Sequence, residues 1–298
     1  MQITSNYISL RAVKNILMLV IQTKKELKDK LSATFLKDKS LGLVPTMGAL
    51  HQGHLSLIKK AIAENDHVVV SIFVNPTQFN NKQDLEKYPK NLENDVQLIS
   101  TVSDKIIIYT PSVNEIYQNN IVAEIYDFNG LDTVMEGEFR DNHFNGVGTI
   151  VEELLTSIKP NKAYFGEKDF QQLTIIKKLV KLKNIPVQII GCPIVREESG
   201  LAMSSRNERL SKDLRKEAAF IYKTLKEAKI KFGTKSASEV TNWVVNEFKK
   251  NDKLNIEYFQ IADTEQLQPL KRKSKNKNYR AFIAVFADDI RLIDNIAL

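Results

Sequence analysis

The amino-acid sequence predicts an α/β fold, with a parallel sheet covered by helices on both faces, followed by a smaller C-terminal α+β domain with an antiparallel sheet. Strand-like and helix-like segments alternate from residue 18 to about residue 192, and the pattern changes after residue 195. The run HVVVSIFV at 67–74 is rich in β-branched residues, which is typical of a strand buried on both faces. Such alternation builds a parallel sheet, in which ligands bind at the carboxyl ends of the strands.

Short apolar runs predict the strands of the first domain, and amphipathic or charged segments predict its helices. Pro160 stops one of these helices. The predicted strands are 18–21, 41–44, 67–74, 105–111, 163–166 and 187–195. The predicted helices are 23–31, 54–65, 94–102, 146–159 and 169–185.

The C-terminal part has a different pattern. Two polar amphipathic helices are predicted near 211–231 and 236–250, and a strand is predicted at 256–263. The segment 281–296 predicts a hairpin that turns at Asp288-Asp289. We therefore expect domains at 18–194 and 195–298, with residues 1–17 ahead of the first of them.

Composition restricts the class of protein. The chain has 298 residues and a net charge of +7. The segment KRKSKNKNYR at 271–280 alone carries six positive charges and no negative one, so the excess of charge is local. We interpret this run as a solvated loop, with a basic contact patch as the alternative. No apolar run approaches the length that spans a bilayer, and the single cysteine, Cys192, excludes an intramolecular disulfide. We expect a cytoplasmic protein that binds neither membrane nor nucleic acid.

The first candidate site is PTMGALHQGH at 45–54, where a predicted strand passes into a helix. The N–H groups at a helix N-terminus favour an anion, and His51 and His54 can donate hydrogen bonds to a phosphate. Gly48 and Gly53 would let a nucleotide approach the backbone. Phosphate binding is the favoured interpretation; a metal-chelating pair and ordinary capping or core histidines are the alternatives.

The second candidate site is FVNPTQF at 73–79, directly after the buried strand. The neutral amides of Asn75 and Gln78 are suited to a hydroxyl or a carboxylate. The alternatives are a turn residue before Pro76 and a surface amide.

The third candidate site is YFGEKDFQQL at 164–173, where a strand ends and a helix begins. Lys168 can neutralise phosphate charge, and Asp169 can hold a magnesium ion or orient the lysine. As an alternative, Asp169 caps the helix and Gln172 completes a capping box.

The fourth candidate site is VREESGLAMSSRNERLS at 195–211, at the expected domain junction. Two serines followed by an arginine in a glycine-containing loop can wrap a triphosphate. The alternative is a polar interdomain linker, with Ser211 capping the next helix.

Taken in order, these blocks resemble the pantothenate synthetase (pantoate–β-alanine ligase) family. That family belongs to the nucleotidyltransferase group, together with class I aminoacyl-tRNA synthetases. The resemblance extends from about residue 18 to the end and includes RLIDNI at 291–296. It implies that residues 1–17 are an N-terminal extension, with a misplaced start ahead of Met18 as the alternative. It departs from the family pattern at Glu198-Ser199, which replace Ala-Asp, and at Lys90, which replaces an arginine. It implies a Rossmann-like first domain and a ligase that joins pantoate to β-alanine with ATP and Mg²⁺ through a pantoyl adenylate.

The resemblance also implies roles for individual residues. His51 and His54 contact the ATP phosphates, with His54 as proton donor or transition-state stabiliser, and Lys168 lies near the phosphates. Gln78 and Gln172 hold pantoate, and Gln78 also lies at the β-alanine site. The remaining ATP-binding residues are Met47, Gly48, Gly166, Glu167, Asp169, Val195, Met203, Ser204, Ser205 and Arg206. Further candidates around the pocket are Asn75, Tyr88, Glu136, Arg140 and His143.

Three other functions fit parts of the pattern. A nucleotidylyltransferase that acts on a phosphorylated acceptor would keep the fold, but it would need more cationic partners than the Gln78 and Gln172 amides. An RNA-binding protein is suggested only by the resemblance to the group that includes the synthetases and by the 271–280 run, and salt-dependent RNA retention would test it. An inactive scaffold conflicts with the intact histidines, lysine and Ser-Ser-Arg. A homodimer is expected from the resemblance alone.

Overall fold

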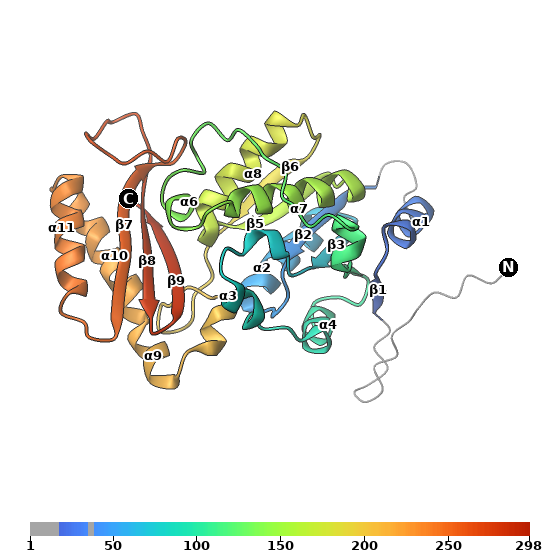
Figure 1. Cartoon of the computed structure of the whole chain (residues 1–298), viewed down its shortest axis with the longest axis horizontal. Coiled ribbons are helices and arrows are strands. Elements are labelled where there is room, and N and C mark those ends of the chain that lie inside the picture. Colours follow the sequence, from blue (N-terminus) through green and yellow to red (C-terminus); the bar gives the residue numbers. More distant parts are fainter. Residues whose placement is uncertain (1–17, 35–38) are drawn as a thin grey trace. The chain divides into compact units, whose positions relative to one another are not determined.

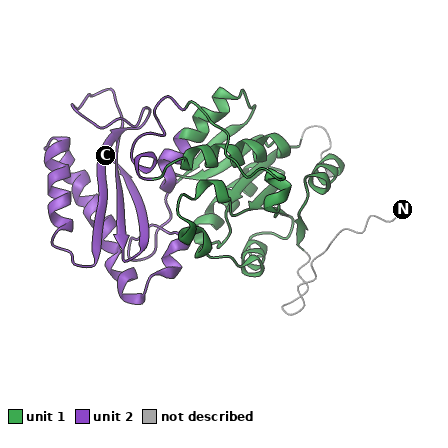
Figure 2. Cartoon of the chain, in the orientation of Figure 1, with its two compact units in different colours: residues 1–127, 140–166, 175–192 green, residues 128–139, 167–174, 193–298 purple. Residues whose placement is uncertain are grey.

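The computed structural model describes residues 18–34 and 39–298, which form two compact units (Figures 1 and 2). The extension expected at residues 1–17 lies outside the described residues. The second unit consists of residues 128–139, 167–174 and 193–298, and the first unit consists of the rest of the chain. Two segments that lie inside 18–194 therefore belong to the second unit.

The first unit contains a six-stranded sheet in which every neighbouring pair is parallel, as predicted. The strand order shows that β2 lies between β3 and β5, so the chain extends the sheet from β2 in both directions. Carboxyl ends next to such a reversal are the usual place for a ligand. In sheet order the strands are β1 (Leu19–Ile21), β4 (Ile107–Tyr109), β3 (His67–Ile72), β2 (Leu41–Thr46), β5 (Lys162–Gly166) and β6 (Gln188–Cys192).

Helices cover both faces of this sheet. Successive residues of a strand point to opposite faces, and residues on both faces are buried. Val44 and Val70 pack with Ile58 of one helix and Ile99 of another in a single cluster. Their strand neighbours, such as Val69, are also buried and point to the other face, against which α7 packs. The helices are α1 (Lys24–Thr34), α2 (Gln52–Glu64), α3 (Lys82–Glu86), α4 (Leu92–Ser100), α5 (Val113–Tyr117) and α7 (His143–Ile158), with the 3-10 turn η1 (Pro76–Gln78).

The observed helices differ from the predicted bounds by a few residues, and two of these differences concern candidate residues or their surroundings. Helix α7 begins at His143, three residues before the predicted start, and ends at Ile158, because Lys159 adopts a left-handed conformation (φ 52°) ahead of Pro160. The 3-10 turn η2 (Glu167–Asp169) leads directly into α8 (Phe170–Leu182). Asp169 therefore occupies a helical position, and the alternative in which it caps α8 is wrong.

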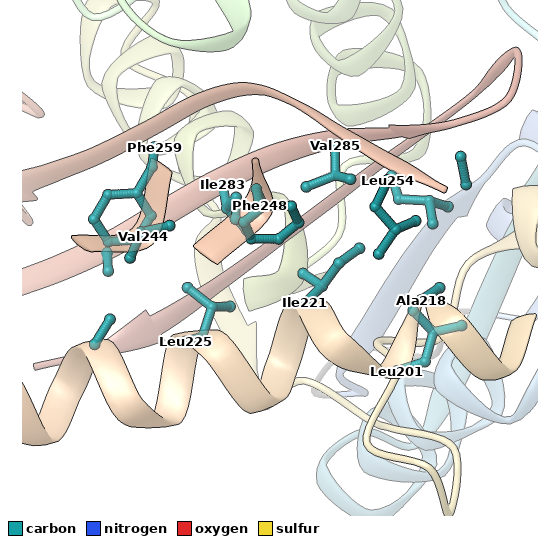
Figure 3. Close-up of a cluster of buried hydrophobic side chains, with 14 of the residues drawn as sticks. Leu201, Ala218, Ile221, Leu225, Val244, Phe248, Leu254, Phe259, Ile283 and Val285 are labelled. Atoms are coloured by element: carbon teal, nitrogen blue, oxygen red, sulfur yellow. The ribbon is translucent and has the colours of Figure 1, made fainter. Parts of the chain in front are cut away.

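The second unit contains a three-stranded antiparallel sheet, as predicted. Figure 3 shows Ile221 and Leu225 of α10 on the side of the sheet that carries Ile283 and Val285. Its strands are β7 (Leu254–Asp263), β8 (Tyr279–Ala287) and β9 (Ile290–Ala297). Its helices are α6 (Glu136–Phe139), η3 (Ser205–Arg209), α9 (Lys212–Glu217), α10 (Ala219–Phe232) and α11 (Ala237–Phe248), so the predicted helix at 211–231 is divided at Ala218.

Most of the basic run forms the expected loop. Residues 271–278 are exposed and join β7 to β8, which confirms a loop between strands, but Tyr279 is buried and Arg280 is half-buried, and both belong to β8. Cys192 is buried at the end of β6, as expected of a small apolar residue. Within the described part of the chain, no helix has the length and apolar character needed to cross a membrane.

Candidate functional site

The loop between β2 and α2 is held in an unusual backbone conformation by one buried carboxylate. Gly48 has φ +81° and Ala49 has φ +49°. Asp95 of α4, only 3% exposed, accepts hydrogen bonds from the backbone N–H groups of Ala49 (3.0 Å) and Leu50 (2.7 Å). A Cβ at Gly48 would lie 2.9 Å from Asp95 Oδ2, so both the φ angle and the available space require glycine there.

Burial raises the pKa of Asp95, while its two backbone hydrogen bonds act in the opposite direction. The sequence analysis did not select this residue. The sequence feature that could have indicated it is its position as a single aspartate on the apolar face of the helix, beside Val96 and one turn from Leu92 and Ile99. It determines the path of the chain into the histidine pair.

Replacing Asp95 with asparagine should destabilise the protein by about 1–3 kcal/mol, because one amide N–H₂ would then face a backbone N–H. The measurement is urea unfolding of the variant against wild type. Asp66→Asn is a matched control, because Asp66 also accepts a backbone N–H, from Ser40 at 2.9 Å, but at an exposed position. Equal losses in the two variants would contradict a specific role for the buried carboxylate.

His51 and His54 form the N-terminal cap of α2. His51 Nδ1 accepts from the Gly53 N–H (3.1 Å), and His54 Nδ1 accepts from the His51 N–H (3.3 Å). The two rings lie 4.1 Å apart between centroids. The capping alternative is thus confirmed, and it is compatible with phosphate binding. Because each Nδ1 accepts, the neutral rings carry their proton on Nε2, at the positive end of a 13-residue helix.

The amide of Gln78 lies beside Met47, also in the first unit. Gln78 Nε2 contacts Met47 Sδ at 2.8 Å, and its Oε1 accepts from Asn75 Nδ2 (3.2 Å). Asn75 is 1% exposed and donates also to the Gly146 carbonyl (3.0 Å), while Tyr117 donates to its Oδ1. Asn75 is therefore a buried brace that orients Gln78 from the start of the turn at Pro76, and Gln78, 8% exposed, is not a surface amide.

The backbone of Gln78 is held by two further candidates. Its carbonyl accepts from His143 Nδ1 (2.7 Å) and from Arg140 Nη2 (3.3 Å), and Arg140 Nη1 lies 3.1 Å from His143 Nε2. These bonds assign the His143 proton to Nδ1, since Nε2 faces a guanidinium donor. Tyr88, 6% exposed, packs edge-on against Phe79. The first unit thus gathers Met47 and the candidates of the 73–79 block around Gln78.

In the second unit, Lys168 lies in the short turn η2. Its side chain is 18% exposed, and Nζ is 3.6 Å from Asp169 Oδ1. Asn295 Nδ2 donates to the Glu167 and Lys168 carbonyls, at 2.9 and 2.8 Å, and Arg280 pairs with the Glu167 carboxylate at 3.2 Å. The backbone that carries Lys168 is therefore fixed, while its amine remains close to one carboxylate.

The two adjacent glutamines after this turn have different roles. Gln171, 4% exposed, donates to the Leu131 and Val134 carbonyls and accepts from the Glu136 N–H, so it joins α8 to the segment before α6. Gln172 is half-buried, and among the described residues its side chain has no hydrogen-bond partner. Of the pair, only Gln171 is therefore committed to hydrogen bonds within the protein.

The loop from Val195 to Arg206 is folded back on itself. The Met203 N–H donates to the Val195 carbonyl (3.0 Å), so these two candidates lie together. Ser204 caps η3 by accepting from the Arg206 N–H (3.3 Å), and Ser205 is 6% exposed. Ser211 caps α9, as the linker alternative expected.

The carboxylate of Glu136 makes its hydrogen bonds and its ion pair within the second unit. Arg291 donates to both of its oxygens, at 2.7 and 2.8 Å, and the Tyr258 hydroxyl donates at 2.8 Å. Burial and the Glu136 charge raise the pKa of Tyr258 well above its ordinary value. These contacts assign Glu136 a structural role that the sequence did not indicate.

No group of three or more His, Cys, Asp or Glu side chains able to hold a metal ion occurs within the described ranges. A divalent ion carried by a polyphosphate would need only one or two carboxylates from the protein. Asp169, with a side chain 45% exposed, is a carboxylate of this kind and pairs with Lys168 in the same turn. The residues present fit an ion that arrives with its ligand.

Comparisons with known proteins agree on one family. The family model described as pantoate-beta-alanine ligase matches residues 19–297. The pantothenate synthetase of Christiangramia forsetii is 60% identical over 87% of this chain and 92% of its own, and that of Flavobacterium psychrophilum is 55% identical over 94% and 100%.

Solved structures give the same result. The pantothenate synthetase of Thermus thermophilus superposes with a TM-score of 0.85 and 36% identity, over 94% of this chain and 99% of its own. The pantoate-beta-alanine ligase of Francisella tularensis, solved with beta-gamma ATP and beta-alanine, gives a TM-score of 0.77 and 37% identity, over 94% and 97%.

Proposed function

Because this chain belongs to the pantoate-beta-alanine ligase family, we propose that it condenses pantoate with β-alanine in two steps, by way of an enzyme-bound pantoyl adenylate. In the first step a pantoate carboxylate oxygen attacks the α-phosphorus of ATP, and pyrophosphate leaves. In the second step the β-alanine amine attacks the acyl carbon, an amide bond forms, and AMP leaves with loss of one amine proton. The observation that carries the proposal is the His51 and His54 pair at the N-terminus of α2.

We propose that this pair stabilises the charge that develops during adenylation. With Nδ1 of each ring used in the helix cap, Nε2–H is the group suited to donate to phosphate oxygens. The helix N-terminus adds a fixed positive potential at the same place. Phosphoryl transfer depends mainly on positioning and on charge stabilisation, which these groups supply without any movement of the loop that Asp95 holds.

Pantoate is the proposed ligand of Gln78 and Gln172. Neutral amides bind its hydroxyl and carboxylate without concentrating competing anions, and Gln78 lies also at the proposed β-alanine site. The support is that Asn75 orients the Gln78 side chain and that Gln172 lacks a protein partner among the described residues. Met47, 2.8 Å from Gln78, would then lie where the acid meets the nucleotide.

ATP is the proposed ligand of a second set of residues. Lys168 would neutralise phosphate charge, Met203 to Arg206 would bind the triphosphate, and Val195 would contact the adenine. Gly48, Gly166, Glu167 and Asp169 complete the proposed ATP-binding set. Mg²⁺ would arrive with the triphosphate and reduce its charge, with Asp169 as the carboxylate available to it. From the family we further propose a cytoplasmic homodimer, whose oligomeric state light scattering of the purified protein would test.

The assay for this function is the release of AMP and pyrophosphate from ATP, with pantoate and β-alanine supplied singly and together. We expect steady turnover to pantothenate only when both acids are present. Turnover with a phosphorylated acceptor in place of pantoate would contradict the proposal and favour a nucleotidylyltransferase.

Replacing Gln78 with glutamate should raise the KM for pantoate by about 10-fold or more, because a carboxylate would then face the substrate carboxylate. The KM for ATP should rise by less than the KM for pantoate, because Gln78 is not among the residues proposed to bind ATP. Gln83→Glu in the exposed helix α3 adds the same charge in the same unit and is the control. An unchanged KM for pantoate in Gln78→Glu would remove Gln78 from the acid site.

A further inference from the structure

The last strand of the second unit carries two polar side chains in a buried position. Asp294 is 5% exposed and Asn295 is 2% exposed, and their β8 partners in register are Ile283 and Phe282. Burying such groups costs free energy unless their hydrogen bonds are made. The partners of this pair are therefore informative.

Asn295 donates twice, through its side-chain nitrogen, to the turn that carries Lys168. Nδ2 donates to the Glu167 carbonyl (2.9 Å) and to the Lys168 carbonyl (2.8 Å). Its Oδ1 accepts from Nη1 of Arg280, whose Nη2 reaches the Glu167 carboxylate at 3.2 Å. The Arg280 guanidinium also lies 4.2 Å over the ring of Phe170, the first residue of α8. The turn η2 is thus fixed from its backbone and from one side chain.

Asp294 makes the corresponding contact with the loop that begins at Val195. Its carboxylate binds Arg196 through two parallel bonds, from Nη1 at 2.6 Å and from Nη2 at 3.0 Å. Arg196 donates also to the Gly200 carbonyl (3.1 Å) and lies 3.6 Å over the ring of Tyr222. A paired, stacked arginine of this kind fixes the start of the loop in one arrangement.

We propose that Asp294 and Asn295 form a template that holds the Lys168 turn and the Val195–Arg206 loop at a fixed separation, and that Asn295 is a positioning residue for Lys168. Adjacent residues of one strand have a fixed spacing, so segments that each contact one of them acquire that spacing. The proposal rests on the proposed function, in which these two segments bind ATP. It assigns the closing strand a role in ATP binding without contact with ATP.

The test compares Asn295→Ala with a matched control, Asn251→Ala. Asn251 also makes three side-chain hydrogen bonds in this unit, donating to Glu217 and accepting from the Lys253 and Leu254 N–H groups. Asn251 lies just before β7, whose first residue, Leu254, pairs with Ala287 at the end of β8. Asn295 pairs with Phe282, nearer the start of β8, so the two asparagines lie at different ends of the sheet. Each variant therefore loses three side-chain hydrogen bonds, and only Asn295→Ala should disturb the turn.

The measurements are the Kd for Mg-ATP by calorimetry and the steady-state rate of AMP formation, on the full chain. We expect Asn295→Ala to weaken ATP binding by about 10-fold or more and Asn251→Ala to change it by less than about 2-fold. In a Lys168→Ala background the effect of Asn295→Ala should largely disappear, since the positioned group is gone. If Asn295→Ala does not fold, Asn295→Asp replaces it, because the new carboxylate keeps the Arg280 contact but repels the two carbonyls.

Each outcome decides a definite point. Equal Kd values in the two asparagine variants, or an undiminished effect without Lys168, would overturn the template while leaving the ligase intact. Wild-type protein that binds ATP but forms no AMP with pantoate and β-alanine would overturn the proposed reaction, and the Kd values would still decide the template. Wild-type protein that does not bind ATP would overturn both.

Discussion

Replacing His54 with alanine is expected to leave a folded protein that has lost about 10²–10³-fold of its adenylation rate. The imidazole is one of two Nε2–H donors placed at the positive end of α2, where the transferring phosphoryl group is proposed to lie. Such donors matter most for charge that appears only in the transition state, so kcat should fall more than the KM for ATP rises. The measurement is AMP formation at saturating pantoate, with and without β-alanine.

The cap gives this experiment a sharp control. His54 Nδ1 accepts from the His51 N–H, so alanine removes a capping bond as well and should cost about 1 kcal/mol of stability. Glutamine at the same position can accept that bond, as it does in ordinary capping boxes, but its flexible amide does not hold an N–H at the position of the imidazole Nε2. We expect His54→Gln to regain the stability and to remain inactive. Recovery of activity together with stability would show that the histidine matters only as a cap.

Replacing Lys168 with alanine is expected to lower kcat/KM for ATP by about 100-fold or more, because one positive charge is removed beside the polyphosphate. The side chain is 18% exposed and its amine lies 3.6 Å from the Asp169 carboxylate, too long for a strong hydrogen bond, so little stability depends on this pair. Asn295 donates to the backbone carbonyls of Glu167 and Lys168, so these bonds do not depend on the side chain at position 168. Kinetics with ATP varied at saturating pantoate would measure the loss.

Lys168→Met and Lys235→Met complete that experiment. Methionine at 168 keeps the apolar stem without the charge and should behave like alanine. Lys235, with a side chain 58% exposed, forms an i,i+4 pair with Glu239 and should tolerate the same change with little effect. A loss confined to the KM for pantoate, with ATP binding unchanged, would place Lys168 at the acid site and contradict the assignment to the phosphates.

The parts of the fold that follow from local pattern were predictable from the sequence. The run at 67–74 forms the central strand β3, flanked by β2 and β4. The β8–β9 hairpin turns at Asp288-Asp289, where Asp288 adopts φ +53°. Local pattern cannot show that residues 167–174 belong to the second unit, because that depends on contacts such as those of Gln171 with Leu131 and Val134, far away in the chain.

The site was predictable in part for the same reason. His51, Gln78 and Lys168 lie directly after strands of a parallel sheet, where the fold class itself directs attention. Asp95 and Asn295 are remote in sequence from the segments they hold, and only the structure pairs them. Each can nevertheless be noticed in the sequence, as a polar residue at an apolar position of a predicted helix or strand.

The polar residues that fix the turns of the candidate site, Asp95 and Asn295, act in the same way. Asp95 binds two N–H groups before α2, and Asn295 binds two carbonyls before α8. In both cases a buried side chain from a distant element satisfies backbone groups of a turn that carries a proposed phosphate ligand. The chemistry proposed here therefore depends on turns fixed before the substrates bind, which is the condition for electrostatic catalysis.

The measurement that tests the adenylate most directly is transfer of ¹⁸O from the pantoate carboxylate. Pantoate labelled in both carboxylate oxygens is turned over with ATP and β-alanine, and the AMP and phosphate products are analysed by mass spectrometry. Attack on the α-phosphorus predicts one ¹⁸O in AMP and none in pyrophosphate. Unlabelled AMP, or release of ADP with ¹⁸O in inorganic phosphate, would contradict the pantoyl adenylate and indicate another activated acid.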